Sequence, residues 1–239
     1  MKEIAKLAWP SPLLTPMLLA GCSDIQTSTW EVELSADPTP HLVELWRETE
    51  DSKPTRVFAY SVEFPQSYYY FRDNHQHLKQ TSIGLLFDRQ TLRPLAPAIV
   101  EEAARPEAQS NFVRPERLLF ERYRTRSLLV TITGLRGEQR LRRPSSPLEP
   151  LPDSPDFLWE SRPSPGDPAS GGTTLSGYSL GDPLVRVSCP SIDGQCAVET
   201  QYLTSRVRFA LPKADLAQAV PVSRRLTELL TRHTKRQGG

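Results

Sequence analysis

One serine of the chain stands in a pattern that hydrolytic enzymes use. Gly177-Tyr-Ser-Leu-Gly181 matches Gly-x-Ser-x-Gly, in which the serine is a nucleophile on a sharp turn between a strand and a helix. Here Asp182-Pro183 and a strand-like stretch follow Ser179, so no helix N-terminus is expected beside it to form an oxyanion hole. His233, a candidate base, lies close to the C-terminal end. We therefore predict a loop in which the glycines form turns, and no catalytic residue or enzymatic activity.

Two histidines raise the question of a metal site. Asp73, His75 and His77 alternate along the chain, so in a strand all three would lie on one face and could bind a metal ion. Their polar surroundings after an aromatic run favour a loop. We predict neither a metal ion nor another cofactor.

The start of the chain predicts its compartment. The first 22 residues carry two lysines, then an apolar run, and end in Leu19-Ala-Gly-Cys22. Positive, apolar and small residues in this order before a lone cysteine resemble a bacterial lipoprotein signal peptide with its lipobox. This resemblance implies that residues 1–21 are removed and that Cys22 is acylated, for example with palmitate.

An acylated Cys22 would tether the protein to a membrane, because each buried methylene contributes about 0.8 kcal/mol. Ser23 follows the cysteine, which resembles the sorting pattern for the outer membrane of enteric-type bacteria. We therefore expect a lipid-anchored protein that faces the periplasm, where disulfide bonds are permitted.

The two remaining cysteines, Cys189 and Cys196, are seven positions apart and flank Asp193-Gly194, a strong turn signal. This spacing favours a disulfide bond across the tip of a hairpin. A metal pair is the alternative, but neither a second cysteine pair nor a His-x-x-x-His pattern accompanies it.

Charge and composition exclude some partners. The chain has 29 basic and 28 acidic residues among 239. Removal of residues 1–21, which contain Lys2, Lys6 and Glu3, leaves 27 of each. A neutral chain gives no support for nucleic-acid binding, which requires a basic face. We expect a protein partner, together with a membrane held through the lipid.

Two short segments are candidates for the contact with that partner. The first is the aromatic run Tyr68, Tyr69, Tyr70, Phe71 with Arg72, since exposed tyrosines suit protein interfaces; packing in the core is the alternative. The second is the arginine-rich stretch 136–143, with Arg140, Arg142 and Arg143. It is either a solvated surface or a contact with an acidic partner or anionic lipid.

Two-residue alternation dominates the remaining pattern and predicts strands. Residues 42–46 fit either a strand or one helical turn, and residues 101–110 a polar excursion or short helix. A short amphipathic helix is expected from an N-cap at Ser223, with Leu226, Leu229 and Leu230 on its apolar face. The predicted strands cover residues 30–34, 56–64, 82–87, 118–123, 127–133, 184–188, 196–200 and 205–211.

The fold class expected from these elements is β-rich α+β, with antiparallel sheets or a sandwich and a C-terminal helix. Eight prolines fall between Pro144 and Pro168, and Phe157 and Trp159 among them are expected to dock onto the fold. Residues 62–67 resemble residues 209–214, which raises the hypothesis of two related β units. The expected divisions are a signal peptide (1–21), an N-terminal half (22–137), a proline- and glycine-rich loop or linker (138–181) and a C-terminal meander with disulfide and helix (182–239).

Two segments resemble a known family. Phe64-Pro-Gln-Ser-Tyr68 with the following Arg72-Asp-Asn74 is similar to a signature of small bacterial immunity lipoproteins encoded beside type VI secretion phospholipase effectors. The paired cysteines and the last amphipathic helix resemble the C-terminal part of the same group. The resemblance implies a membrane-tethered periplasmic protein that binds a lipase effector and blocks its active site. A structural or assembly lipoprotein of the envelope is the alternative, and a hydrolase using Ser179 is a third.

Overall fold

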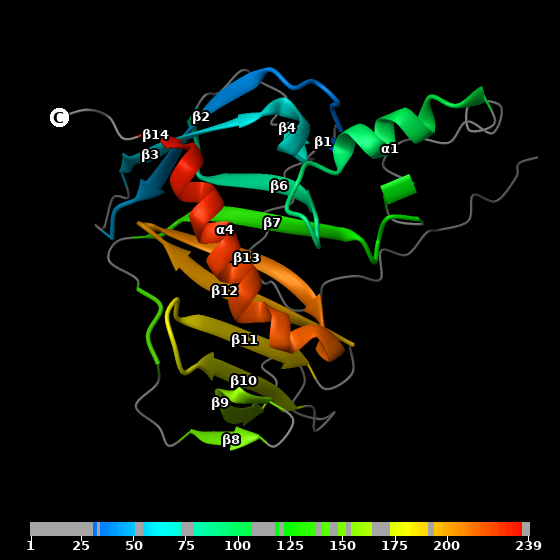
Figure 1. Ribbon diagram of the computed structural model, residues 1–239. Coiled ribbons are helices and arrows are strands. Elements are labelled where there is room, and N and C mark those ends of the chain that lie inside the picture. The colour runs from blue at the N-terminus through cyan, green and yellow to red at the C-terminus, as the bar shows by residue number, and fades with distance from the viewer. Residues whose placement is uncertain are drawn as a thin grey trace, which may run out of the picture.

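The fold is β-rich α+β, as the sequence predicts (Figure 1). A computed structural model describes residues 31–32, 34–50, 55–72, 79–106, 118–119, 122–136, 140–143, 148–151, 154–163, 173–190 and 194–235.

The largest unit is an antiparallel sheet of eight strands, which runs from top to bottom in Figure 1. Its middle is the meander of β11, β12 and β13, in agreement with the alternation read from the sequence. In sheet order the strands are β6 (Ser82–Asp88), β7 (Ser127–Gly134), β13 (Ser205–Pro212), β12 (Gln195–Tyr202), β11 (Val185–Pro190), β10 (Thr173–Ser179), β9 (Ser154–Pro163) and β8 (Glu149–Leu151).

A second sheet lies above the first in Figure 1 and has four strands, with β3 and β2 at its centre. The ambiguous stretch 42–46 belongs to β2 and is extended. In sheet order the strands are β14 (Thr234–Lys235), β3 (Arg56–Pro65), β2 (Pro40–Glu48) and β5 (Lys79–Gln80), and β1 (Glu31–Val32) pairs separately with β4 (Phe71–Arg72).

Two α-helices are described, α1 (Ala96–Ala103) and α4 (Ala219–His233). Short 3-10 helices follow two of the strands, η1 (Gln66–Tyr68) after β3 and η2 (Lys213–Gln218) after β13. None of the helices in the described part of the chain is long and apolar enough to cross a bilayer.

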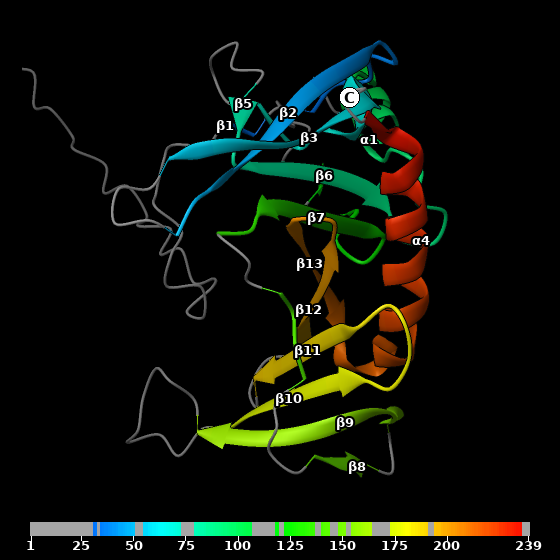
Figure 2. The same cartoon turned by 90° about the vertical axis from the view of Figure 1, so that its left-hand side faces the viewer.

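One face of the large sheet carries the main core. The alternating residues of β12 and β13 that point to this face are buried, and so are those of β6, β7 and β11. They pack against the four-stranded sheet and against Val222, Leu226 and Leu230 of α4. Figure 2 shows α4 along one side of the large sheet. A smaller cluster of α1, Leu86 and Leu118–Leu119 forms on the opposite side of β6.

Two glycines are fixed by close packing. A Cβ on Gly134 would overlap the backbone carbonyl oxygen of Trp46, where β2 crosses the end of β7. A Cβ on Gly177 would meet the ring of Trp159 at 2.9 Å. Glycine is therefore needed at both positions because backbone or an aromatic ring occupies the space of a side chain.

The turn after β6 depends on one buried carboxylate, Asp88. Its Oδ1 accepts hydrogen bonds from the backbone N–H of Gln90 at 3.1 Å and of Thr91 at 3.0 Å, and its Oδ2 accepts one from Arg126 Nε at 2.5 Å. Burial alone would raise the pKa of Asp88, but hydrogen bonds from Arg126 and Thr91 outweigh it and hold the pKa below its usual value.

The prediction of a loop or linker over residues 138–181 is wrong, because β8, β9 and β10 lie within it. Proline lacks an N–H and cannot occupy the middle of a ladder, but it is accepted at strand ends and at the edge of a sheet. Pro155 and Pro163 stand near the two ends of β9, and the outermost strand β8 is only three residues long. Phe157 and Trp159 are buried in the core, as expected.

Three smaller expectations also change. Leu118 and Leu119 are helical rather than extended, because they cover α1 in the smaller cluster. Helix α4 begins at Ala219, four residues before the expected N-cap Ser223, which is fully buried inside it. Pro221 is accepted there, since the first N–H groups of a helix have no intrahelical partner.

The two similar hexamers share their local structure. Each ends a strand in a proline of nearly the same conformation, φ −51° and ψ 143° at Pro65 and φ −55° and ψ 143° at Pro212. A 3-10 helix follows in both cases. The similarity is therefore local, and a duplication of a whole β unit stays a prediction.

Candidate interaction surface

The tyrosines of the aromatic run pack inward: Tyr69 belongs to the main core and Tyr70 to the smaller cluster beside α1. Tyr69 and Tyr70 are only 8% and 5% exposed, and Tyr68 is half-buried. The Tyr69 hydroxyl donates a hydrogen bond to the His41 carbonyl oxygen at 3.0 Å, and burial raises the pKa of both Tyr68 and Tyr69. Side chains with so little exposed surface pack in the core and are not available to a partner. The prediction that Tyr69 and Tyr70 contact a partner is therefore wrong.

The last two residues of this run, Phe71 and Arg72, form β4 and pair with Val32 and Glu31. Their side chains lie outside the described residues. A contact of Phe71 or Arg72 with a partner therefore stays a prediction.

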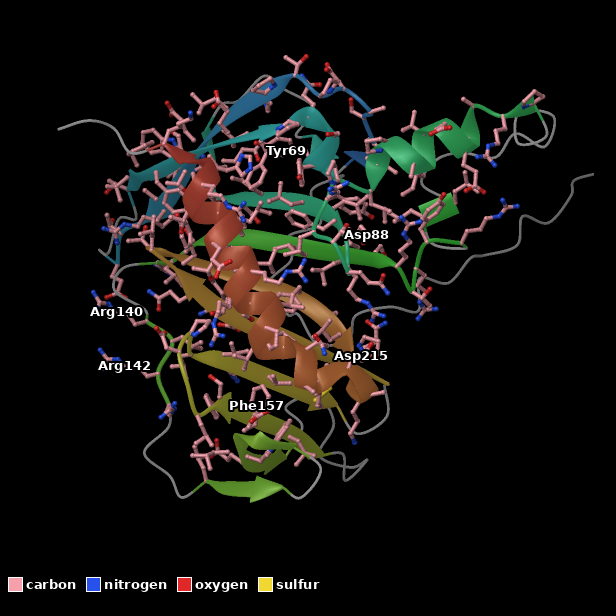
Figure 3. All side chains as sticks on the ribbon, in the orientation of Figure 1. Tyr69, Asp88, Arg140, Arg142, Phe157 and Asp215 are labelled. Carbon is pink, nitrogen blue, oxygen red and sulfur yellow. A yellow bond between two sulfur atoms is a disulfide. The ribbon has the colours of Figure 1, made fainter. Side chains whose placement is uncertain are left out.

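The second predicted segment is at the surface. Arg140, Arg142 and Arg143 are exposed beside the ends of β10 and β12, and Figure 3 shows Arg140 and Arg142 far from Tyr69. Arg143 donates hydrogen bonds to the carbonyl oxygens of Ser179 and Leu180, at 2.6 and 2.7 Å. The fold does not bring the aromatic and arginine segments together into one site.

The structure adds charged residues that the sequence analysis did not single out. On the side of the large sheet away from α4, Arg186, Glu199 and Arg208 are direct neighbours in register across β11, β12 and β13. Glu199 forms ion pairs with Arg206, whose Nε lies 2.7 Å from its carboxylate, and with Arg208, whose Nε lies 3.3 Å away. We call these four residues the arginine face.

The arginine face is continuous with the exposed segment 140–143. Gln201 stands directly opposite Arg206, and its Oε1 accepts a hydrogen bond from the Leu141 N–H at 3.0 Å. Arg186, Arg206 and Arg208 therefore flank Glu199, and three more arginines stand in the adjoining segment 140–143, although the chain as a whole is nearly neutral. A second carboxylate, Glu160 of β9, lies on the same side of the sheet, in register with Ser176 of β10. Such segregation creates a local positive potential that overall charge does not reveal.

The side chains of the arginine face differ in how far they are exposed to solvent. Glu199 is only 12% exposed at its side chain, whereas Arg208 is 49% exposed. Arg186 lies deeper, and its Nε atom is buried without a hydrogen-bond partner. The alternation of arginine with apolar residues in Leu184-Val-Arg-Val-Ser188 and Ser205-Arg-Val-Arg-Phe209 was the signal for this face. It places the arginines on one side of the sheet.

A row of small or apolar residues runs beside the arginine face. Ala197, Ala210 and Leu129 follow one another across β12, β13 and β7, on the same side of the sheet as Arg208. All three are exposed, Leu129 by 37%. Because alanine side chains are short, the backbone of the sheet lies close to the surface beside the arginines, and Leu129 lies at the margin of this area.

The serine of the Gly-x-Ser-x-Gly pattern is a buried structural residue. Ser179 ends β10 and is 1% exposed. Its hydroxyl accepts a hydrogen bond from the Val185 N–H at 2.9 Å and donates to the Pro183 carbonyl oxygen at 3.1 Å. Strand β11 follows the turn at Asp182–Pro183, a cis peptide, so the strand–turn–helix geometry of a nucleophile elbow is not formed here.

The predicted disulfide bond is confirmed. Cys189 and Cys196 are bonded across the β11–β12 connection and are buried in the main core. Among the described residues, no cluster of three or more His, Cys, Asp or Glu side chains could hold a metal ion. Cys22, Asp73, His75 and His77 lie outside the described residues.

Comparison with known proteins gives little further information. No protein-family model and no curated protein matches the sequence. Among solved structures, the iron-regulated outer membrane lipoprotein FrpD of Neisseria meningitidis is similar to 87% of this chain and 98% of its own, at 9% identity and a TM-score of 0.41. A likeness this distant carries no conclusion about function.

Proposed function

We propose that this protein is a lipid-anchored binding protein of the bacterial envelope that neutralises a secreted lipase effector. The observation that carries the proposal is the clustering of Arg186, Arg206 and Arg208 beside Glu199 on the side of the large sheet away from α4, next to the exposed arginines of segment 140–143. Guanidinium groups at a surface suit recognition of another protein, because they form paired hydrogen bonds with carboxylates.

The anchor fits the same role. A lipid on Cys22 would hold the arginine face close to the membrane that a phospholipase must attack. Tethering raises the effective concentration of an inhibitor at its target without a new contact. The structural use of the Ser179 hydroxyl also favours binding over hydrolysis.

The first experiment tests the partner. The mature chain, made without lipid by Cys22→Ser, is immobilised and exposed to lysate of its own organism, and bound proteins are identified by mass spectrometry. The purified partner is then assayed on phospholipid vesicles with increasing amounts of the mature chain. We expect a phospholipase whose activity falls to background near an equimolar ratio.

Two outcomes would contradict the proposal. Capture of envelope-assembly proteins without a lipase would indicate the structural or assembly role. Capture of a lipase whose activity does not change would leave binding without neutralisation. The anchor is tested separately by labelling cells with an alkyne analogue of palmitate, since Cys22→Ser should abolish the label and release the protein from membranes.

A further inference from the structure

We propose that the arginine face and the adjoining row of Ala197, Ala210 and Leu129 form the docking surface, and that the partner presents a cluster of protein carboxylates there. This inference deepens the proposed function and assumes that the protein acts by binding. It places the contact on the strands of the large sheet and not on the aromatic run.

The first argument is the arrangement of donors. Glu199 engages Arg206 and Arg208 through their Nε atoms and so fixes the direction of both side chains. Each guanidinium has four further N–H donors on its two Nη atoms. Arginines held in place lose less side-chain entropy on binding than free ones, which favours a specific contact with carboxylates.

The second argument is the excess of positive charge. Glu199, 12% exposed, is flanked by three arginines on the sheet, and segment 140–143, which joins the face through the Leu141–Gln201 hydrogen bond, adds three more. Even with Glu160 on the same side of β9, arginines outnumber the carboxylates of the described strands here. The partner surface complementary to this excess is acidic. Complementary charge steers encounter and excludes basic surfaces, although the chain carries almost no net charge.

The third argument concerns shape and favours a protein over a lipid surface. Ala197 and Ala210 are cross-strand neighbours with short side chains. A partner's side chains can therefore approach the backbone of the sheet beside the arginines. The guanidinium of Arg186 is partly buried, with its Nε atom shielded from solvent. Binding to a bilayer is instead favoured by long basic and aromatic side chains that project outward.

On the opposite side of the large sheet, the described strands are covered and their residues do not form a free surface. There the four-stranded sheet and α4 cover the apolar residues of the large sheet. The exposed arginines of α4 include Arg224 and Arg232, which lie on the far side of the molecule from the arginine face. They provide a matched control with the same change in charge.

The test uses poly-L-glutamate as the acidic protein probe and vesicles containing phosphatidylglycerol as the anionic lipid probe. Binding of the mature Cys22→Ser chain is measured at low salt for Arg206→Gln/Arg208→Gln and for the control Arg224→Gln/Arg232→Gln. We expect the dissociation constant for poly-L-glutamate to rise about tenfold in the first variant, because hydrogen bonds to charged groups are lost. The control should change it less than about twofold.

A second variant guards against loss of folding. Ala210→Glu adds a carboxylate at an exposed position that removes no ion pair, and it should weaken poly-L-glutamate binding several-fold through repulsion and competition for Arg208. Circular dichroism and the melting temperature establish that each variant is folded. Vesicle binding should not depend on any of these substitutions.

The inference is overturned by equal effects of the two double variants, by absence of poly-L-glutamate binding at low salt, or by arginine-dependent binding to vesicles. Its failure is distinguishable from failure of the proposed function. A lipase neutralised equally well by Arg206→Gln/Arg208→Gln would reject the docking surface alone. Arginine-dependent binding to poly-L-glutamate without any captured lipase would reject the lipase partner alone.

Discussion

Replacement of Ser179 by alanine separates a structural serine from a catalytic one. The substitution removes the acceptor for the Val185 N–H, at 2.9 Å, and the donor to the Pro183 carbonyl oxygen, at 3.1 Å. Val185 is fully buried, so water cannot replace the lost partner. A buried donor left unpaired costs about 1–3 kcal/mol. Ser179→Ala should therefore lower the free energy of unfolding by about that amount.

The assay is thermal or urea unfolding of the mature Cys22→Ser chain followed by circular dichroism. Each kcal/mol corresponds to roughly 2–4 °C in melting temperature for a domain of this size. The matched control is Ser188→Ala. Ser188 is half-buried in β11, on the side of the sheet that carries the arginine face, and its replacement should change stability by less than about 0.5 kcal/mol. Unchanged stability of Ser179→Ala would refute the structural reasoning, and loss of a measurable esterase activity would restore the hydrolase hypothesis.

Three further predictions concern the elements that hold the sheets together. Cys189→Ser/Cys196→Ser should lower the free energy of unfolding by about 2.5 kcal/mol, the chain-entropy value for so short a loop, as measured by urea unfolding against the oxidised chain. Asp88→Asn should lower it by at most about 1 kcal/mol at pH 7, because Arg126 is largely exposed. The pKa of Asp88 in the folded chain is depressed, so the stability difference between the two chains should be fully present above about pH 4 and vanish as the pH falls through that pKa. A stability difference that persists at pH 2 would contradict the ion pair. Gly134→Ala should lower the melting temperature clearly more than an alanine at exposed Gly194, where a Cβ meets nothing within 4 Å.

Alternation identified most of the large sheet because one face of each strand is buried. In Ser205–Pro212 every second residue, from Ser205 to Leu211, points into the core, and the intervening residues face solvent. Such a pattern is local and can be read without knowledge of the fold. The disulfide was predictable for the same reason, since seven positions and a turn signal between two cysteines define a hairpin tip.

Residues 138–181 show where local reasoning failed. Proline density argues against strand pairing, but the effect of a proline depends on whether its missing N–H would have faced a neighbouring strand. That neighbour is set by the order of the sheet, which places the three-residue strand β8 at its edge and β9 next to it. The alternation of Phe157 and Trp159 was the local signal for a strand, and it was assigned to docking of a loop.

The tyrosines were misassigned because exposure is a property of the assembled fold. The segment Tyr68–Tyr70 reads as a dense aromatic patch, but it follows β3 where the two sheets meet, and Tyr69 closes onto the His41 carbonyl of β2. The arginines of β11 and β13 were not singled out from the sequence. They lie in separate strands, and only the register across β11, β12 and β13 brings them beside Glu199.

The arginine face is hard to explain by stability alone. Partly exposed ion pairs contribute about 0–1 kcal/mol each, so two pairs to Glu199 add little to folding. Arg186 has a buried Nε atom without a partner, which costs free energy. The exposed side of a sheet is equally well served by threonine. Two arginines held by Glu199, with Arg186 beside them and a row of alanines adjoining, therefore fit the requirements of a specific contact better than those of the fold.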